Sequence, residues 1–381
     1  MIYLDNSSTT LIKPKEVLRY ITLAATRFTA NPGRSGHNES IQAAMEVEKV
    51  RAKLKDMFNL ESESNVIFTS SCSIALNIAI LGSAKQGGHV VCTENDHNSV
   101  LRPLEHLKQI GKIDYTVAYQ SSIGCLKCED IEKCLRPETY MVVCNHMSNV
   151  NGDTAEINKI GKMCKEKGLL FLVDGAQSGG HEKIDMQSDN IDFLTLAPHK
   201  GFYGLQGLGV LCIRAPEAIE PIFFGGTGTN SLELIQPDVL PERFEVGTLP
   251  TPAILALSGG IDFVNENFNA IREHLDDLTT FLHYELSSLP VEIYTTTENA
   301  KGVFAFNIPN MHSTDVATYL NDRWGICVRG GYHCAAKKHE ALGLVDRGAV
   351  RASLSYFTSF SDVQKLIAAI RTLLKKQKMI K

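Results

Sequence analysis

The sequence predicts an α/β fold in which one large, mostly parallel sheet is joined to a smaller α+β domain. First, short β-branched or apolar runs alternate with helical patterns through most of residues 1–260. Second, runs such as residues 169–173 are apolar throughout, as expected of strands buried on both faces of a parallel sheet. Third, the pattern changes after Pro252, where a long helical stretch precedes several short strands.

The elements follow in chain order. In the alternating part, strands are predicted over residues 65–69, 89–92, 140–144, 169–173, 193–196 and 209–213. The helices between them are predicted over residues 73–84, 100–110 and 157–167. After Pro252, the predicted elements are a long helix over 261–286, strands at 291–294, 303–306, 326–329 and 350–354, and a final helix at 361–376. We therefore expect a large domain over residues 13–255 and a small domain formed by residues 1–12 and 256–381.

Composition narrows the class of protein. A chain of 381 residues predicts two domains, at about 150 residues each. The net charge of −5, with no basic run before the C-terminal lysines, argues against nucleic-acid binding, because lysines there suit a helix end. No stretch approaches the about 20 apolar residues of a membrane span. We also expect no signal peptide, because residues 1–10 fit a short strand and a polar turn. Ten cysteines without the spacing of a small disulfide scaffold indicate a reducing compartment, so we expect the cytoplasm.

Cys125 and Cys128 have the spacing of a zinc knuckle, but no second Cys or His pair follows at ligand distance. Residues 121–135 also fit a turn that leads into an amphipathic helix. We favour the turn and helix, and expect no metal site.

Polar side chains follow the predicted strands, at the sheet edge where ligands bind in open α/β folds. Ser70–Ser73 open the helix after strand 65–69, where hydroxyls and free N–H groups suit an anion; plain N-capping by serine is the alternative. His97 follows strand 89–92. Its imidazole could stack on a flat ring, although a loop histidine is also an ordinary surface residue.

An amide, an acid and a lysine follow the next three strands. Asn149 follows strand 140–144, and Asp174 ends the apolar run 169–173. A carboxylate there needs a partner, and a pyridinium N–H is one; a capping aspartate is the alternative. Lys200 follows strand 193–196, and a lysine reacts with a carbonyl where its surroundings lower its pKa.

With these loops in place, the chain resembles the class V aminotransferase-like family of pyridoxal-phosphate enzymes, and within it the group II-like cysteine desulfurases and selenocysteine lyases. The resemblance runs nearly end to end through segments that include residues 3–6, 31–37, 174–177, 199–200, 243–248, 329–334 and 350–353. It implies fold type I of the PLP-dependent transferases. In that fold a mostly parallel seven-stranded sheet carries the cofactor, and a smaller α+β domain carries a nucleophilic cysteine loop.

The resemblance implies pyridoxal 5′-phosphate as the cofactor. Lys200 is similar to the lysine that binds it covalently, Asp174 to the acid at the ring nitrogen, and His97 to the stacking imidazole. Asn149 and Gln177 are similar to the partners of the ring hydroxyl oxygen.

The phosphate contacts implied by the resemblance are Ser73 and His199, with Cys72 in the same loop. Here the chain departs from the family, because residues 71–74 replace a loop that is commonly Gly-Thr-Thr-Glu-like. Thr248 is similar to a phosphate contact that comes from the second subunit, which implies a homodimer.

The substrate would be L-cysteine or L-selenocysteine. Arg351 is similar to the arginine that binds its carboxylate, where a planar guanidinium suits the geometry, and we place Arg329, Asn31 and His37 around the substrate as well. Cys334 is similar to the nucleophilic cysteine, and Arg329 and His333 would favour its thiolate; a small buried hydrophobe is the alternative. Residues 334–339 lack the proline that often follows this cysteine.

The expected reaction is the conversion of L-cysteine to L-alanine, with Lys200 taking the α-proton and Cys334 accepting sulfur as a persulfide, from which a sulfur-acceptor protein could receive it. Three alternatives stay open. They are a selenocysteine lyase that releases selenide, another lyase or epimerase of this fold that does not use Cys334, and a non-catalytic protein that only binds a sulfur carrier. The intact lysine, acid and imidazole argue against the last.

Overall fold

The computed structural model describes residues 1–122, 124–297 and 301–380. Its main sheet has seven strands, in the order β2-β10-β9-β8-β6-β3-β4. Their bounds, in that order, are Val66–Thr69, Gly209–Ile213, Phe193–Leu196, Leu170–Asp174, Thr139–Asn145, Gly88–Thr93 and Ile113–Ala118. β10 runs antiparallel to both of its neighbours, and the other pairs are parallel. The predicted mostly parallel, seven-stranded sheet is therefore confirmed.

Both faces of the sheet are buried, and successive residues of a strand contribute to opposite layers. In β8, Phe171 and Val173 pack in one apolar cluster while Leu172 packs in the other. The first layer contains α2 (Asn38–Phe58) and α6 (Ile157–Lys167), and the second contains α3 (Cys72–Gly82) and α4 (Asn98–Gln109). This burial explains why these strands are apolar throughout rather than alternating.

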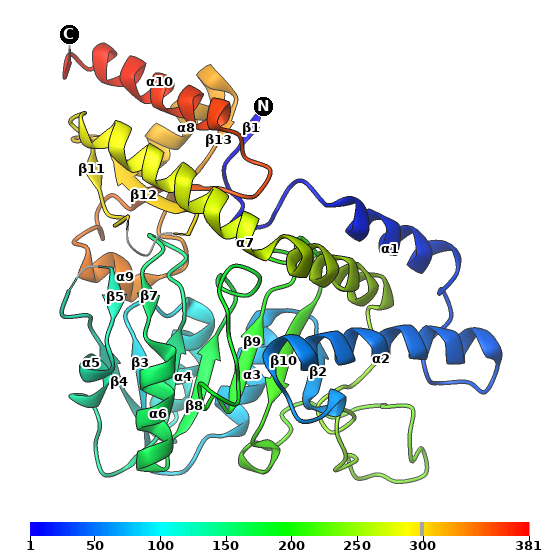
Figure 1. The fold of residues 1–381 in the computed structure, drawn as a ribbon. Coiled ribbons are helices and arrows are strands. Elements are labelled where there is room, and N and C mark those ends of the chain that lie inside the picture. The colour runs from blue at the N-terminus through cyan, green and yellow to red at the C-terminus, as the bar shows by residue number, and fades with distance from the viewer. Residues whose placement is uncertain (123, 298–300, 381) are drawn as a thin grey trace.

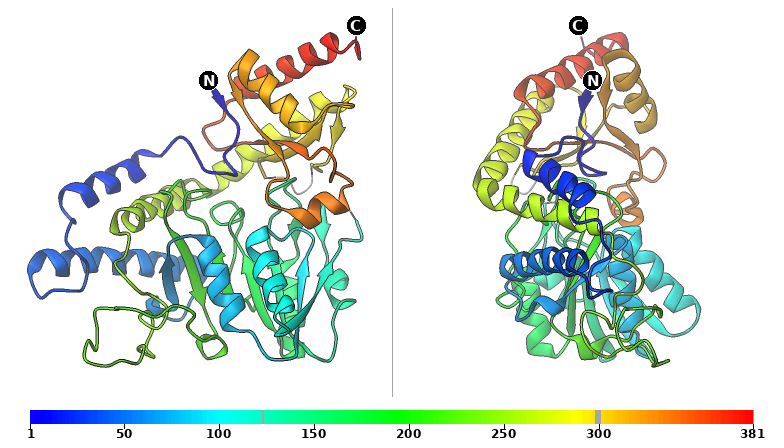
Figure 2. Two further views of the ribbon diagram at one scale, coloured as in Figure 1. Left: turned by 180° about the vertical axis from the view of Figure 1, so that it is seen from behind. Right: turned by 90° about the vertical axis from the view of Figure 1, so that its right-hand side faces the viewer.

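The second sheet is antiparallel and has the order β11-β12-β15-β14. Its strands span Glu292–Ile293, Val303–Asn307, Ala349–Ser353 and Arg329–Gly331. The helices that follow in this part of the chain are α8 (Ser313–Trp324), α9 (Ala336–Ala341) and α10 (Phe360–Lys376). The N-terminal strand β1 (Ile2–Tyr3) pairs with β13 (Ile326–Cys327), so both ends of the chain lie in this smaller layer (Figures 1 and 2).

One long helix, α7 (Thr251–Ser287), runs from the main sheet to the smaller one (Figure 1). It begins ahead of the predicted residue 261 because Pro252 occupies its first turn, where proline is compatible with a helix, and residues 253–257 are buried. The expected domain boundary at 255/256 thus falls inside this helix and stays a prediction. The backbone of α7 packs closely against the backbone at Phe202. A Cβ on Gly260 would lie 2.0 Å from the carbonyl oxygen of Phe202, so this contact requires a glycine.

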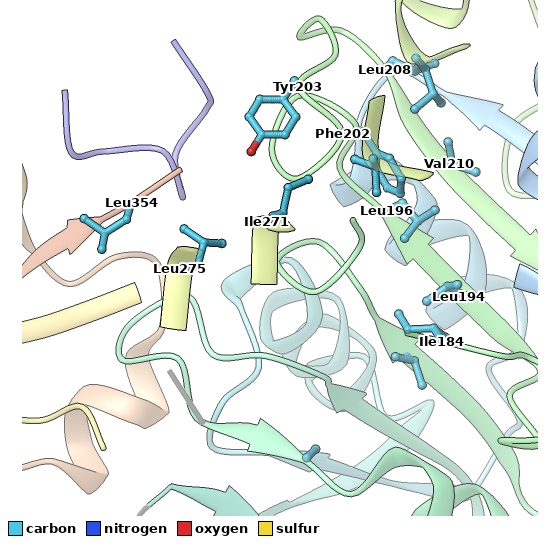
Figure 3. Packing of buried hydrophobic residues seen from close by; sticks show 14 of the residues in the cluster. Ile184, Leu194, Leu196, Phe202, Tyr203, Leu208, Val210, Ile271, Leu275 and Leu354 are labelled. Atoms are coloured by element: carbon cyan, nitrogen blue, oxygen red, sulfur yellow. The ribbon is translucent and has the colours of Figure 1, made fainter. Parts of the chain in front are cut away.

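Apolar packing around α7 supports the loop that carries Lys200. Tyr203 and Phe202 follow that lysine and are buried, and Figure 3 shows them near Ile271 of α7 and Leu196 of β9. The Tyr203 ring meets Phe263 of α7 edge-on, with ring centroids 5.3 Å apart. The loop therefore rests on a packed core.

Several elements were not assigned from the sequence, namely α1 (Lys15–Thr26), α2 and β4. The turn expected before the cysteine-rich segment leads through β5 (Cys125–Leu126) into a short helix, α5 (Cys128–Glu132); β7 (Thr154–Ala155) pairs with β5. Within the described ranges, every helix is too short or too polar to cross a bilayer.

Candidate active site

A cavity is lined by residues that follow the carboxyl ends of the main strands, and Figure 1 shows that the smaller sheet lies beyond the same edge of the main sheet. Five strand-end loops contribute to it, as the strand-end positions predicted. Its lining includes Cys72, Ser73, His97, Asn149, Asp174, Gln177, His199 and Lys200. Eight of the fourteen predicted site residues therefore meet in one place.

Asp174 is the last residue of β8 and is 2% exposed. Its Oδ1 accepts a hydrogen bond from Ala176 N at 2.9 Å, and the Cys72 thiol lies 3.9 Å from the same oxygen. Burial and the Asp174 charge raise the pKa of Cys72, so the thiol is neutral and donates to the carboxylate. A buried carboxylate that faces a cavity is suited to bind a protonated ring nitrogen.

Lys200 lines the same cavity as this carboxylate. Burial lowers its pKa, against the opposing effect of the nearby Asp174 and Cys72. A lowered pKa leaves more of the amine unprotonated at neutral pH, which is what a lysine needs in order to attack a carbonyl.

His97 is both the N-cap of α4 and a wall of the cavity. Its Nδ1 accepts from Ser99 N at 3.0 Å, so the ring proton of the neutral form lies on Nε2. Burial lowers the pKa of His97 to about 4, although Asp174 opposes the shift. The imidazole is therefore neutral at pH 7 and held in one orientation, as stacking on a flat ring requires.

The sequence left two interpretations of Ser70–Ser73 open, an anion site and plain N-capping of the helix, and different serines of this loop suit each. Ser71 is the N-cap of α3, accepting from Ile74 N, whereas Ser73 lines the cavity and its Oγ lies 2.7 Å from Ser99 Oγ. His199 Nδ1 is buried and has no hydrogen-bond partner among the residues that the structure describes. Free donors at a helix N-terminus and an unpaired imidazole nitrogen suit a phosphate.

Asn149 and Gln177 already use part of their hydrogen-bonding capacity within the protein. Asn149 Nδ2 donates to the His333 carbonyl at 2.7 Å, and Gln177 Nε2 donates to the Ser7 carbonyl at 3.0 Å. Each amide has a second N–H, and Asn149 Oδ1 is buried without a partner in the described part of the chain. Both side chains therefore keep atoms for a ligand.

Arg351, on β15, is 1% exposed and holds a position beside these loops. Its Nη1 donates to the Asn149 carbonyl at 2.8 Å, and its Nη2 to Asp5 Oδ1 at 2.6 Å and Ser8 Oγ at 2.9 Å. Its Nε is buried and unpaired within the described ranges. Arg329 donates to the same Ser8 hydroxyl at 3.2 Å.

Asp5 and Ser8 were not predicted as site residues. Asp5 lies within residues 3–6, a segment that carries part of the resemblance, and Ser8 follows two residues after it, so that segment was the available signal. Nothing in the local pattern shows that these residues meet Arg351.

Cys334 lies between β14 and α9 and is exposed, which excludes the alternative of a buried hydrophobe. Its carbonyl accepts from Asn98 N at 2.8 Å, the residue next to His97, so the Cys334 backbone is joined to the loop that carries His97 into the cavity. The predicted help from His333 is wrong, because burial lowers the pKa of His333 well below its usual value and leaves it uncharged. Arg329 remains as the cation of this pair.

Thr248, Asn31 and His37 do not line the Lys200 cavity of their own chain. Thr248 is exposed, Asn31 lines a separate hollow, and His37 caps α2 by accepting from Ser40 N at 3.2 Å. The expectation that Asn31 and His37 surround the substrate therefore finds no support within a single chain.

Pyridoxal phosphate fits this set of groups. The cavity offers an acid for its ring nitrogen, a neutral imidazole for its face and an amine for its aldehyde. The unpaired atoms of Asn149 and His199 are where its hydroxyl oxygen and phosphate need partners.

The family model for aminotransferase class V matches residues 2–366. The chain belongs to this family. A probable cysteine desulfurase of Methanothermobacter thermautotrophicus is 34% identical over 96% of this chain and 92% of its own length. One of Pyrococcus abyssi is 32% identical over 98% and 94%.

Solved structures agree with the fold. The apo cysteine desulfurase of Thermococcus onnurineus superposes with a TM-score of 0.92 at 31% identity, covering 98% of this chain and 95% of that one. A cysteine desulfurase of Escherichia coli has a TM-score of 0.87 at 23% identity, with 98% and 94% covered, and supports the fold alone.

Proposed function

We propose that this protein is a pyridoxal-phosphate-dependent cysteine desulfurase that converts L-cysteine to L-alanine and receives the sulfur on Cys334. The observation that carries the proposal is a cavity lined by Lys200, Asp174 and His97, with the exposed Cys334 in a loop that is hydrogen-bonded to the residue after His97. The names of relatives that match almost the whole chain support it.

The protein groups would divide the work as follows. Lys200 would hold the cofactor covalently and, once substrate replaces it, take the α-proton of cysteine as a general base. Asp174 and His97 would hold the ring, and Arg351 the substrate carboxylate. When bound, pyridoxal phosphate supplies an electron sink for the pair released at the substrate Cα.

Sulfur transfer would use Cys334 as a thiolate. Its sulfur attacks the substrate sulfur, so a new S–S bond forms while the substrate Cβ–S bond breaks and its electron pair stays with the carbon. Protonation of that carbon, and return of the α-proton from Lys200 to Cα, yield alanine, and Cys334 is left as a persulfide. A thiol or a sulfur-acceptor protein would then remove the outer sulfur.

The protein would act as a homodimer with composite sites. Phe224, Leu232, Leu234 and Ile235 are exposed apolar side chains on the segment that precedes Thr248 (Figure 1). Gly247 N donates to the Gly226 carbonyl at 2.9 Å, which places the start of this segment beside Thr248. An exposed apolar patch of this kind is typical of a protein–protein contact, and a two-fold axis would build two equivalent sites.

The test is chemical identification of the cofactor lysine and the products. Borohydride reduction of the protein loaded with pyridoxal phosphate, followed by peptide mass spectrometry, should find the adduct on Lys200. The Lys200→Ala variant should lose both the adduct and the formation of alanine from cysteine, whereas Lys183→Ala should keep both. An adduct on Lys183 or Lys162, or wild-type protein that forms no alanine, would sink the proposal.

Parallel assays with cysteine and selenocysteine decide between the desulfurase and the selenocysteine lyase. Alanine with sulfide or persulfide supports the desulfurase, and turnover of selenocysteine alone would favour the lyase.

A further inference from the structure

Outside the cavity, a lysine is buried together with two carboxylates. Lys338 Nζ lies 2.8 Å from Glu94 Oε1 and 2.8 Å from Asp153 Oδ2, and the three side chains are 1%, 4% and 1% exposed. The proposed reaction uses none of them. We call Lys338, Glu94 and Asp153 the buried triad.

The buried triad joins two parts of the chain that lie far apart in the sequence. Lys338 is on α9, which begins two residues after Cys334, whereas Glu94 follows β3 and Asp153 precedes β7. Gln120 ties the two carboxylates together, because its Nε2 donates to Asp153 Oδ2 at 2.9 Å and its backbone N to Glu94 Oε2 at 3.3 Å. The triad therefore fastens α9 to the edge of the main sheet from which the cavity is built.

We expect the buried triad to fix the position of α9 more than to increase the free energy of unfolding. Desolvation of buried charges offsets most of their attraction, and apolar replacements are often as stable. Removing Lys338, in contrast, breaks the link between α9 and the two carboxylates, and leaves these to repel each other beside the hollow that all three side chains line.

The loop that precedes α9 has a strained backbone, which its surroundings must hold in place. His333 and Cys334 have positive φ angles of 51° and 55°, a left-handed conformation that costs energy for residues other than glycine and persists only where the surroundings enforce it. Asn149 Nδ2 and Asn98 N bind the two carbonyls of this pair. On the α9 side, His333 Nδ1 lies 3.3 Å from His339 Nε2, so a displaced α9 would release the loop.

We infer that Lys338 is a positioning residue for sulfur transfer: through the buried triad it clamps α9 and holds the Cys334 loop against the loop of His97. The inference rests on the proposed desulfurase function. It adds a requirement that cofactor and substrate binding do not share, because among the described residues the side-chain hydrogen bonds and ion pairs of the triad reach neither the cavity lining nor Arg351.

The chain offers a matched control in the adjacent lysine. Lys337 is on the same helix but pairs at the surface with Glu340, at 2.7 Å. We therefore compare Lys338→Met with Lys337→Met in the full-length protein loaded with pyridoxal phosphate. The measurements are the cofactor absorbance, KM and kcat for L-cysteine, the rate of persulfide formation on Cys334, and hydrogen exchange of peptides spanning residues 329–344.

In Lys338→Met we expect kcat and persulfide formation to fall by about tenfold to a hundredfold, as for a misplaced reacting group. KM and cofactor absorbance should stay close to wild type, and hydrogen exchange in residues 329–344 should become faster. Lys337→Met should match wild type in every measurement. Lys338→Arg, which keeps the charge, should recover part of the lost rate.

If Lys338→Met does not fold, Glu94→Gln removes one charge but leaves the Lys338–Asp153 pair, and should show the same effects more weakly. Exchange and persulfide formation that are the same in the Lys338 variants, Glu94→Gln and Lys337→Met would overturn the clamp. A failure of the proposed function would look different, because wild-type protein itself would then form no persulfide on Cys334.

Discussion

Replacing Arg351 by methionine should weaken the use of L-cysteine without removing the cofactor. Arg351 Nη1 uses one of its two N–H bonds on the Asn149 carbonyl, and Nη2 donates to Asp5 and Ser8. We expect a substrate carboxylate to bind side-on, to the Nε that is unpaired within the described ranges and to the Nη2 N–H that now binds Asp5. The Asp5 side chain is 23% exposed, and can turn to water when a substrate carboxylate takes its place.

The magnitude follows from this exchange. A hydrogen bond to a charged group contributes about 1.5–3 kcal/mol, so two bonds would contribute about 3–6 kcal/mol. Because one of the two replaces an existing bond to Asp5, the net loss should lie at the lower end, about 3 kcal/mol. At 1.4 kcal/mol per factor of ten, kcat/KM for cysteine should fall by about 100-fold, mostly through KM.

Steady-state kinetics of alanine formation, with the absorbance of bound cofactor as a check on folding, measure this effect. Arg347→Met is the matched control, since Arg347 lies four residues earlier and pairs with Glu292 where both side chains are partly exposed. Binding of the product L-alanine, followed through the cofactor absorbance, should weaken in parallel with kcat/KM. If Arg351→Met and Arg347→Met have the same kcat/KM, the assignment of the carboxylate site is wrong.

Three further predictions concern the thiol, the dimer and the lysine. Cys334→Ser should abolish turnover of cysteine while cofactor absorbance persists, because a hydroxyl is a poor nucleophile toward sulfur. Turnover of selenocysteine should survive, since selenide can leave without an acceptor. Unchanged turnover of cysteine would show that Cys334 is structural. Leu234→Asp places a charge on the exposed apolar segment, so sedimentation should show weaker dimers together with lower activity, and a fully active monomer would contradict composite sites. Because burial lowers the pKa of Lys200, its amine stays unprotonated to lower pH. The rate of cofactor attachment, trapped with borohydride, should therefore fall less between about pH 9 and about pH 7 than the rate at which pyridoxal phosphate reacts with a free lysine, whose usual pKa is about 10.4. An equal fall in the two rates would argue against a buried amine.

The local sequence determined most of the large sheet and half of the candidate site. Apolar runs bounded by turns identify strands such as β8 and β9, and the polar residue that follows each run lies at a carboxyl end. Parallel strands bring their carboxyl ends to one edge. Asp174 and Lys200 could therefore be placed together although nothing in the sequence gives their distance. Helix starts were less certain: α7 begins earlier than its pattern indicates because residues 253–257 are buried by tertiary packing.

Only the tertiary structure decided which groups hold the site in place. Asp5 pairs with Arg351 across 346 residues of sequence, and Lys338 pairs with Glu94 across 244. Such contacts leave no local periodicity, because an isolated lysine or aspartate looks the same whether it is solvated or buried. The sequence alone determined that a lysine, an acid and a cysteine were present in a suitable order. Tertiary contacts decided that Cys334 is exposed in a loop joined to that of His97 and that Lys338 is buried against two carboxylates, since the energy of a charge depends on what surrounds it after folding.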